Sequence, residues 1–135
     1  IIFDDFGNLT RLSDATLQEM QNAGIEVQVF NPVHRYINRI YFNYRDHRKI
    51  AVIDGIWAYT GGINIADEYA NIIDRFGYWK DGGVCITGEA AWGFTREFLR
   101  MWERMGGKFP QPYDDYRPAV QLADKQDADS PAQYL

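Results

Sequence analysis

Short apolar runs separated by turn residues occupy much of the chain, and one long segment has helical spacing instead. Alternating or short apolar runs bounded by Gly, Asn or Pro predict strands, here IIFDD, IEVQVF, KIAVID, IWAYTG and GGVCITG. From Glu89 to Arg104 apolar residues recur at helical spacing, which predicts the longest helix, and a Gly-Gly pair ends it. Strands that alternate with helices indicate an α/β domain whose sheet is at least partly parallel.

Cap and turn residues predict where several of these elements begin and end. Ser13 is suited to cap a second helix that runs to about Asn22. The Asp-Gly pair at 54–55 predicts the turn of a hairpin between KIAVID and IWAYTG. After Gly62 the backbone can turn sharply, and INIADEYAN then predicts a short helix.

The length of 135 residues suits one domain with a core of ordinary size. No apolar run is long enough to cross a membrane and the first residues lack a signal-peptide pattern, so we expect this chain to be soluble. Its single cysteine, Cys85, excludes an internal disulfide, and we expect it to be a small core residue. Together with His34 and His47 it gives no metal-ligand spacing, so no metal is expected.

The net charge of −5 is unevenly distributed. Residues 110–135 are acidic and poor in apolar residues, which predicts a linker. Basic residues dominate between positions 34 and 49, as Arg35, Arg39, Arg45, Arg48 and Lys49. These arginines form either a solvated face or contacts to an anionic headgroup. A small anion fits this cluster, whereas the overall acidity argues against nucleic acid as a partner.

His47 and Lys49 are two residues apart, so in a strand both side chains point to the same face. An imidazole can attack phosphorus or move a proton, and an ammonium can neutralise a phosphoryl oxygen. The pair alone is better explained as chance on a strand edge. Asp54, Gly62 and Asn64 extend it to H-x-K-x4-D followed by G-G-x-N, which favours a phosphoryl-transfer site.

This pattern resembles the phospholipase D superfamily. NYRDHRKIAVIDG, TGGINIADEY, RFGYWKD and WGFTREFLRMW are similar to the first catalytic half of its bacterial cardiolipin synthases. The resemblance covers nearly all of the chain up to Met105. It implies a phospholipase D-like mixed sheet flanked by helices, as a single partial domain over 1–109 that lacks its first strand-helix unit. Residues 110–135 would then be an acidic linker toward a second half.

The resemblance also implies an activity, namely a phosphatidyltransferase that condenses two phosphatidylglycerols to cardiolipin and glycerol through a phosphohistidine, without a cofactor. His47 would be the nucleophile or the general acid. Lys49 and Asn64 would hold the phosphoryl oxygens, with Gly62 at a position where many relatives carry serine.

The resemblance implies a catalytic role for one carboxylate and leaves two roles open for another. Asp81, in YWKD, lies where the family usually keeps an acid that orients the histidine. Asp54 belongs to the family motif, but its place beside Gly55 also allows a structural role in the turn.

Family members unite two H-x-K motifs, whereas this chain has one, because His34 is followed by Arg-Tyr. We therefore expect a fragment of a longer enzyme of the bacterial cell membrane, whose second H-x-K-x4-D half is its partner. By itself such a fragment would be an inactive assembly module. The alternative is another phosphodiesterase or nuclease of the superfamily, in which a homodimer brings two copies of His47 together.

Overall fold

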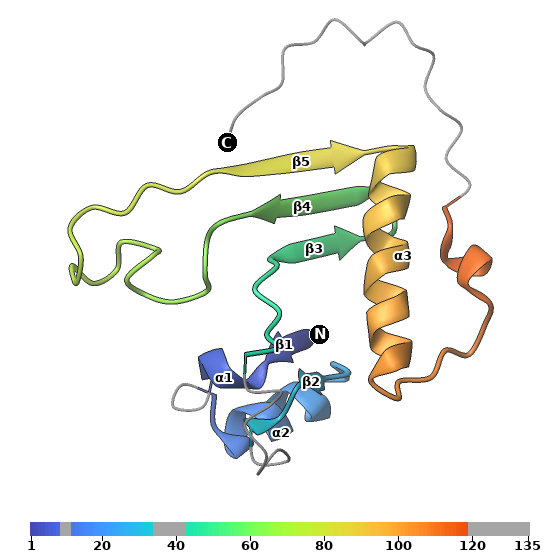
Figure 1. Cartoon of the computed structure of the whole chain (residues 1–135), viewed down its shortest axis with the longest axis horizontal. Helices are drawn as coiled ribbons and strands as arrows, with labels where there is room; N and C mark the ends of the chain where they lie inside the picture. Colours follow the sequence, from blue (N-terminus) through green and yellow to red (C-terminus); the bar gives the residue numbers. More distant parts are fainter. Residues whose placement is uncertain (9–11, 34–42, 119–135) are drawn as a thin grey trace, which may run out of the picture. The chain divides into compact units, whose positions relative to one another are not determined.

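The computed structural model describes residues 1–8, 12–33 and 43–118 (Figure 1). In chain order the elements are β1 (Ile2–Asp4), α1 (Asp5–Asn8), α2 (Asp14–Asn22), β2 (Gln28–Phe30), β3 (Ile50–Ile53), β4 (Trp57–Gly61), β5 (Gly83–Thr87), α3 (Glu89–Arg104) and the 3-10 helix η3 (Tyr113–Tyr116). They fall into two compact units, Ile1–His47 with Met101–Phe109, and Arg48–Arg100 with the described residues from Pro110. The α/β class is confirmed.

The first unit contains a parallel strand pair connected through α2. β1 and β2 are in register from Ile2 opposite Gln28 to Asp4 opposite Phe30. Parallel strands need a crossover connection, and α2 lies within it. The Ser13 hydroxyl accepts the backbone N–H of Thr16 at 3.1 Å, so the predicted capped helix is confirmed.

The second unit contains the antiparallel sheet β3-β4-β5, whose strands run side by side in alternating directions (Figure 1). β3 and β4 form the predicted hairpin, with Ile53 opposite Trp57. Asp54 and Gly55 have φ of 54° and 67°, the left-handed pair that a tight hairpin turn requires. Gly55 is further constrained, because a Cβ there would lie 2.9 Å from a side-chain carbon of Pro118.

Helix α3 confirms the helix predicted from apolar spacing. Its buried residues within the second unit are Ala91, Trp92, Thr95 and Leu99, which follow one another around a single face. In β4, Ala58 is fully buried. The segment around η3 covers α3, because Arg117 pairs with Glu89 at 2.5 Å and the Tyr113 hydroxyl donates to the Leu99 carbonyl at 3.5 Å.

Three expectations about local structure are wrong. The segment INIADEYAN contains turns and no helix, and none of its apolar residues is buried. Cys85 is exposed rather than in the core, because it lies on a face of the sheet that is open to solvent, as the exposure of its paired residue Tyr59 on the central strand shows. His47 and Lys49 precede β3 instead of lying in it, since the ladder with β4 begins at Ile50.

No helix in the described part of the chain is both long and apolar enough to cross a lipid bilayer.

Candidate functional site

One end of the antiparallel sheet gathers three of the predicted site residues. Ile50 of β3 pairs with Thr60, and Gly61 at the end of β4 pairs with Gly83 at the start of β5. Lys49 directly precedes β3, Gly62 directly follows β4, and Asp81 stands two residues before β5. The register therefore places Lys49, Gly62 and Asp81 at the same sheet end.

Gly62 and Asp81 are in direct contact. A Cβ added at Gly62 would lie 2.5 Å from Oδ1 of Asp81, so the carboxylate occupies the space that a side chain would need. The Gly62 N–H donates to the Gly82 carbonyl at 3.3 Å and continues the strand pairing by one residue. At Gly61 a Cβ would lie 2.6 Å from the same carbonyl oxygen. The Gly-Gly pair is thus required by close backbone approach and by the position of Asp81.

The loop before β5 holds the Asp81 carboxylate in place. Oδ1 accepts the Gly82 N–H at 2.8 Å, and Oδ2 accepts the indole N–H of Trp79 at 3.4 Å. Asn71 binds the backbone of Trp79 on both sides, accepting its N–H at 2.7 Å and donating to its carbonyl at 2.9 Å. The Tyr69 ring meets the Trp79 ring edge to face at 4.7 Å between centroids.

Trp79 and Asn71 were not predicted as site residues. An indole two residues before a carboxylate, as in YWKD, is a sequence signal for the Trp79–Asp81 contact. Asn71 has a φ of 56°, and Asn is one of the few residues that adopt this conformation readily. Its contact with Trp79 spans eight residues and has no comparable signal.

The remaining predicted site residues take different positions. His47 is exposed, stands two residues before Lys49 and is the last residue of the N-terminal segment of the first unit. Asn64 is half-buried and follows Gly62 by two residues. Asp54 lies in the turn at the opposite end of β3, about 16 Å along an extended strand from Lys49. The structure thus brings Gly62 and Asp81 together and separates Asp54 from that end of the sheet.

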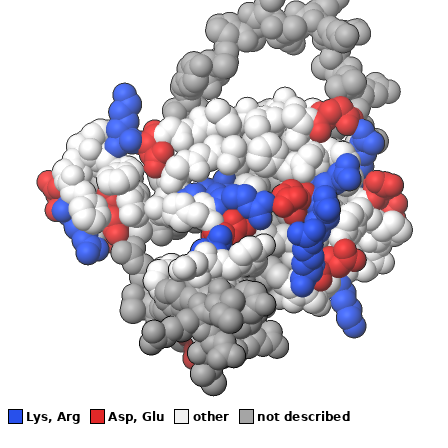
Figure 2. All heavy atoms as spheres, viewed as in Figure 1, with Lys and Arg blue, Asp and Glu red and all other residues white. Residues whose placement is uncertain are grey.

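The arginines near His47 that the structure describes are paired with carboxylates. Arg45 lies 3.2 Å from Oδ1 of Asp4, and Arg48 lies 2.8 Å from Oε1 of Glu97 on α3. On the face drawn in Figure 2, Lys and Arg side chains lie beside Asp and Glu side chains rather than forming a continuous basic surface. Arg35 and Arg39 lie outside the described residues. Arg45 and Arg48 therefore form neither a purely solvated face nor a row of uncommitted headgroup contacts.

The described residues contain no group of three or more His, Cys, Asp or Glu side chains that could hold a metal ion.

Comparison with known proteins gives relatives that share most of this chain. It is 36% identical over 120 residues to a cardiolipin synthase of Oceanobacillus iheyensis, covering 89% of this chain and 25% of that protein. It is 32% identical over 123 residues to the major cardiolipin synthase ClsA of Bacillus subtilis, covering 87% and 25%. An uncharacterized protein of Streptococcus mutans is 47% identical over 102 residues, covering 76% and 22%.

The chain spans about a quarter of the length of the curated relatives it matches. No family model and no solved structure matches it. The shared sequence supports the predicted relationship to cardiolipin synthases, because proteins of that name align with most of this chain.

Proposed function

We propose that this chain is the N-terminal catalytic half of a cardiolipin synthase, which condenses two phosphatidylglycerols to cardiolipin and glycerol. The observation that carries the proposal is the sheet end formed by Lys49, Gly62 and Asp81, in a chain 36% identical to a protein of that name over 89% of its length. The family would be the phospholipase D superfamily, with its mixed sheet flanked by helices. The complete enzyme would act at the bacterial cell membrane, where its phospholipid substrate lies.

His47 would either attack the phosphodiester or protonate the leaving alcohol. In the first step the P–O bond to glycerol breaks and a P–N bond to a histidine forms, while the leaving oxygen takes a proton from the second histidine. In the second step the hydroxyl of another phosphatidylglycerol attacks phosphorus, gives its proton back to that second histidine and releases the nucleophile. The two histidines would supply the nucleophile and the proton transfers, so the proposed steps include no cofactor.

The other site residues would stabilise the charge on phosphorus. The Lys49 ammonium and the Asn64 amide would donate to the non-bridging oxygens, where the charge is spread in the transition state. Asp81 would accept the second ring N–H of His47 and so orient the imidazole. Gly62 supports this role, because it leaves room for the Asp81 carboxylate. Asp54 would serve the hairpin turn, which its φ of 54° supports.

The second histidine would come from a second H-x-K-x4-D half. Residues 1–109 would form the first half and 110–135 the acidic linker toward the second. Alone, the chain would then be an assembly module without turnover, because one histidine cannot both attack and protonate the leaving group in one step.

A chimera tests this directly. The segment of Bacillus subtilis ClsA that aligns with this chain is replaced by it, and cardiolipin and glycerol are measured with phosphatidylglycerol vesicles. We expect turnover by the chimera, loss of at least about 1000-fold for His47→Asn, and retained turnover for the control His34→Asn. A folded chimera without turnover, or one that keeps turnover without His47, contradicts the proposal.

The chain by itself provides the second measurement. It is incubated with phosphatidylglycerol and, separately, with single-stranded DNA. We expect no product from either substrate. Cleavage of DNA that His47→Asn abolishes would instead establish the dimeric nuclease, and transfer of phosphatidyl groups by the chain alone would refute the inactive module.

A further inference from the structure

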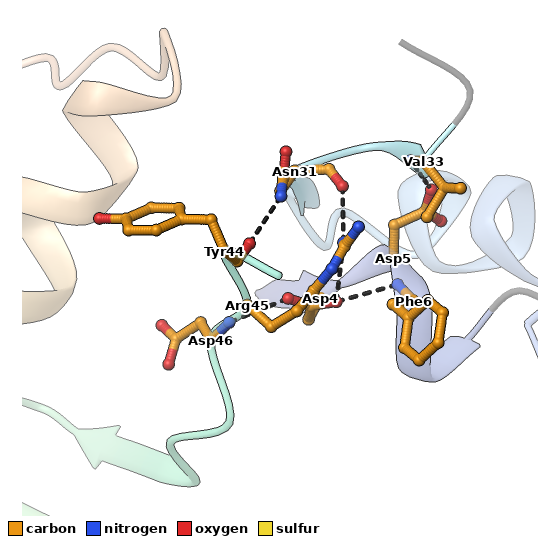
Figure 3. Close-up of polar contacts among 8 residues, drawn as sticks. All are labelled: Asp4, Asp5, Phe6, Asn31, Val33, Tyr44, Arg45 and Asp46. Atoms are coloured by element: carbon orange, nitrogen blue, oxygen red, sulfur yellow. Dashed lines mark hydrogen bonds and ion pairs between the residues drawn. The ribbon is translucent and has the colours of Figure 1, made fainter. Parts of the chain in front are cut away.

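The geometry points to Asp4 as a positioning residue for His47, acting through the two residues that precede it in the chain. The inference rests on the proposed function only in making His47 the reacting group. Asp4 is the last residue of β1, and its carboxylate binds both Arg45 and Asp46 (Figure 3).

Each carboxylate oxygen of Asp4 binds a different residue of the segment before His47. Oδ1 accepts from Nη1 of Arg45 at 3.2 Å, and Oδ2 accepts the backbone N–H of Asp46 at 2.9 Å. Oδ1 also accepts the backbone N–H of Phe6, two residues further along the chain, at 2.9 Å. This local hydrogen bond helps to fix the rotamer of Asp4. The backbone one residue before His47 is therefore bound to the end of a strand.

A second set of contacts comes from the residue after β2. The Asn31 carbonyl accepts from Nη1 of Arg45 at 2.9 Å, and the Asn31 side chain donates to the Tyr44 carbonyl at 2.6 Å (Figure 3). Asp4 and Phe30 are opposite each other in the parallel pair, so Asp4 and Asn31 both lie at the carboxyl end of the two strands. Residues 44–46 thus contact the carboxyl ends of both strands.

This anchoring is needed because residues 44–49 belong to no helix or strand. Without a ladder, the direction of the chain before His47 depends on these side-chain contacts. Displacement of a reacting group by about 1 Å can lower a rate by about 100-fold. Holding Asp46 at a strand end therefore affects the reaction without any contact between Asp4 and substrate.

The Asp4–Arg45 pair is better shielded from solvent than the Arg48–Glu97 pair. The Arg45 and Asp4 side chains are 18% and 12% exposed, whereas those of Arg48 and Glu97 are 47% and 45% exposed. Partial burial strengthens a charge-assisted hydrogen bond and makes the loss of one partner costly for the other. Removal of the Asp4 charge should consequently release the whole segment, not only one contact.

The test uses the complete chain labelled with nitrogen-15, in which His34 and His47 are the only histidines. Asp4→Asn should accelerate amide exchange at Asp46 about tenfold or more and shift or broaden the ring signals of His47. Asp4→Glu, which keeps the charge, should restore part of both effects. Unchanged Asp46 exchange and unchanged His47 ring signals in Asp4→Asn would overturn the inference.

Asp5→Asn is the matched control. Oδ2 of Asp5 accepts the Val33 N–H at 2.7 Å, so this variant removes a neighbouring carboxylate with a different target. We expect faster exchange at Val33 with Asp46 and His47 unaffected. The Gln28 N–H, which donates to the Ile1 carbonyl at 2.8 Å, reports on the strand pair. Equal acceleration of Gln28 and Asp46 in Asp4→Asn would mean general unfolding and would refute positioning.

These spectra are recorded without substrate, so they decide the positioning role even if phosphatidyl transfer is never found. In an active chimera, Asp4→Asn should lower kcat about 10-fold to 100-fold with KM unchanged. A variant with the kcat of the parent chimera, or with a change in KM alone, would show that Asp4 does not act through His47.

Discussion

Asn71 supports the loop that carries Asp81, and its replacement should loosen that loop by a calculable amount. The amide makes two hydrogen bonds with the Trp79 backbone, at 2.7 Å and 2.9 Å. Each contributes about 0.5–1.5 kcal/mol, and because both are exposed the lower part of that range applies, about 1–2 kcal/mol together. Asn71→Gly removes both bonds without adding strain at this positive φ. Asn71→Ala adds about 1 kcal/mol, because the backbone there has a φ of 56°.

Amide exchange at Trp79 measures this loss directly. Since 1.4 kcal/mol corresponds to a factor of ten, the Trp79 N–H should exchange about 5-fold to 30-fold faster in Asn71→Gly, and faster still in Asn71→Ala. Gln18→Ala is the control, because it removes an exposed amide contact with Asn22 at 3.2 Å on α2. Equal Trp79 exchange in the wild-type chain and in Asn71→Gly would refute the reasoning, and so would equal acceleration by Gln18→Ala.

Three further predictions concern the sheet and α3. Leu99→Ala should lower the free energy of unfolding by about 2–5 kcal/mol in urea, since Leu99 is 5% exposed; a loss below about 1 kcal/mol would show that its site collapses. Gly61→Ala should lower the free energy of unfolding by about 1–3 kcal/mol, because its Cβ would lie 2.6 Å from a backbone oxygen. Gly93→Ala in α3 should raise the free energy of unfolding, because its Cβ would meet no other atom and Ala favours the helix; the reverse order of the two variants would contradict the close packing at Gly61. Cys85→Ala should lower the pKa of Tyr59 toward its usual 10.0, because the hydrogen bond with Cys85 and then its charge raise that pKa. The ring NMR signals of Tyr59 against pH measure the shift, and an unchanged curve would exclude the contact.

Elements with local signals were predicted correctly from the sequence. The cap at Ser13, the Asp54-Gly55 turn and the apolar face of α3 depend on residues within one or two turns of each other. Each signal acts through hydrogen bonds or burial that the same segment supplies, so a pattern of a few residues was enough to define the element.

The errors fall where distant residues decide the structure. The segment after Gly62 has helix-compatible residues, but Asn71 bonds to Trp79 instead of continuing a helix. Cys85 lies in an apolar run that resembles a buried strand, yet its side chain is on the solvent-exposed face of the sheet together with that of Tyr59. Neither the eight-residue contact nor the choice of which sheet face is covered is encoded in a periodic pattern.

The two proposed catalytic side chains are also held in different ways, one by a contact that is local in the sequence and the other by a distant residue. Asp81 is held by Trp79 two residues away, a spacing visible in YWKD once the indole is considered as a donor. The segment before His47 is held by Asp4, whose bond to the Asp46 N–H spans 42 residues. That bond forms at the carboxyl end of the parallel strand pair β1 and β2. A motif can therefore identify the reacting group, while the residue that positions it becomes evident only when the strand pairing is known.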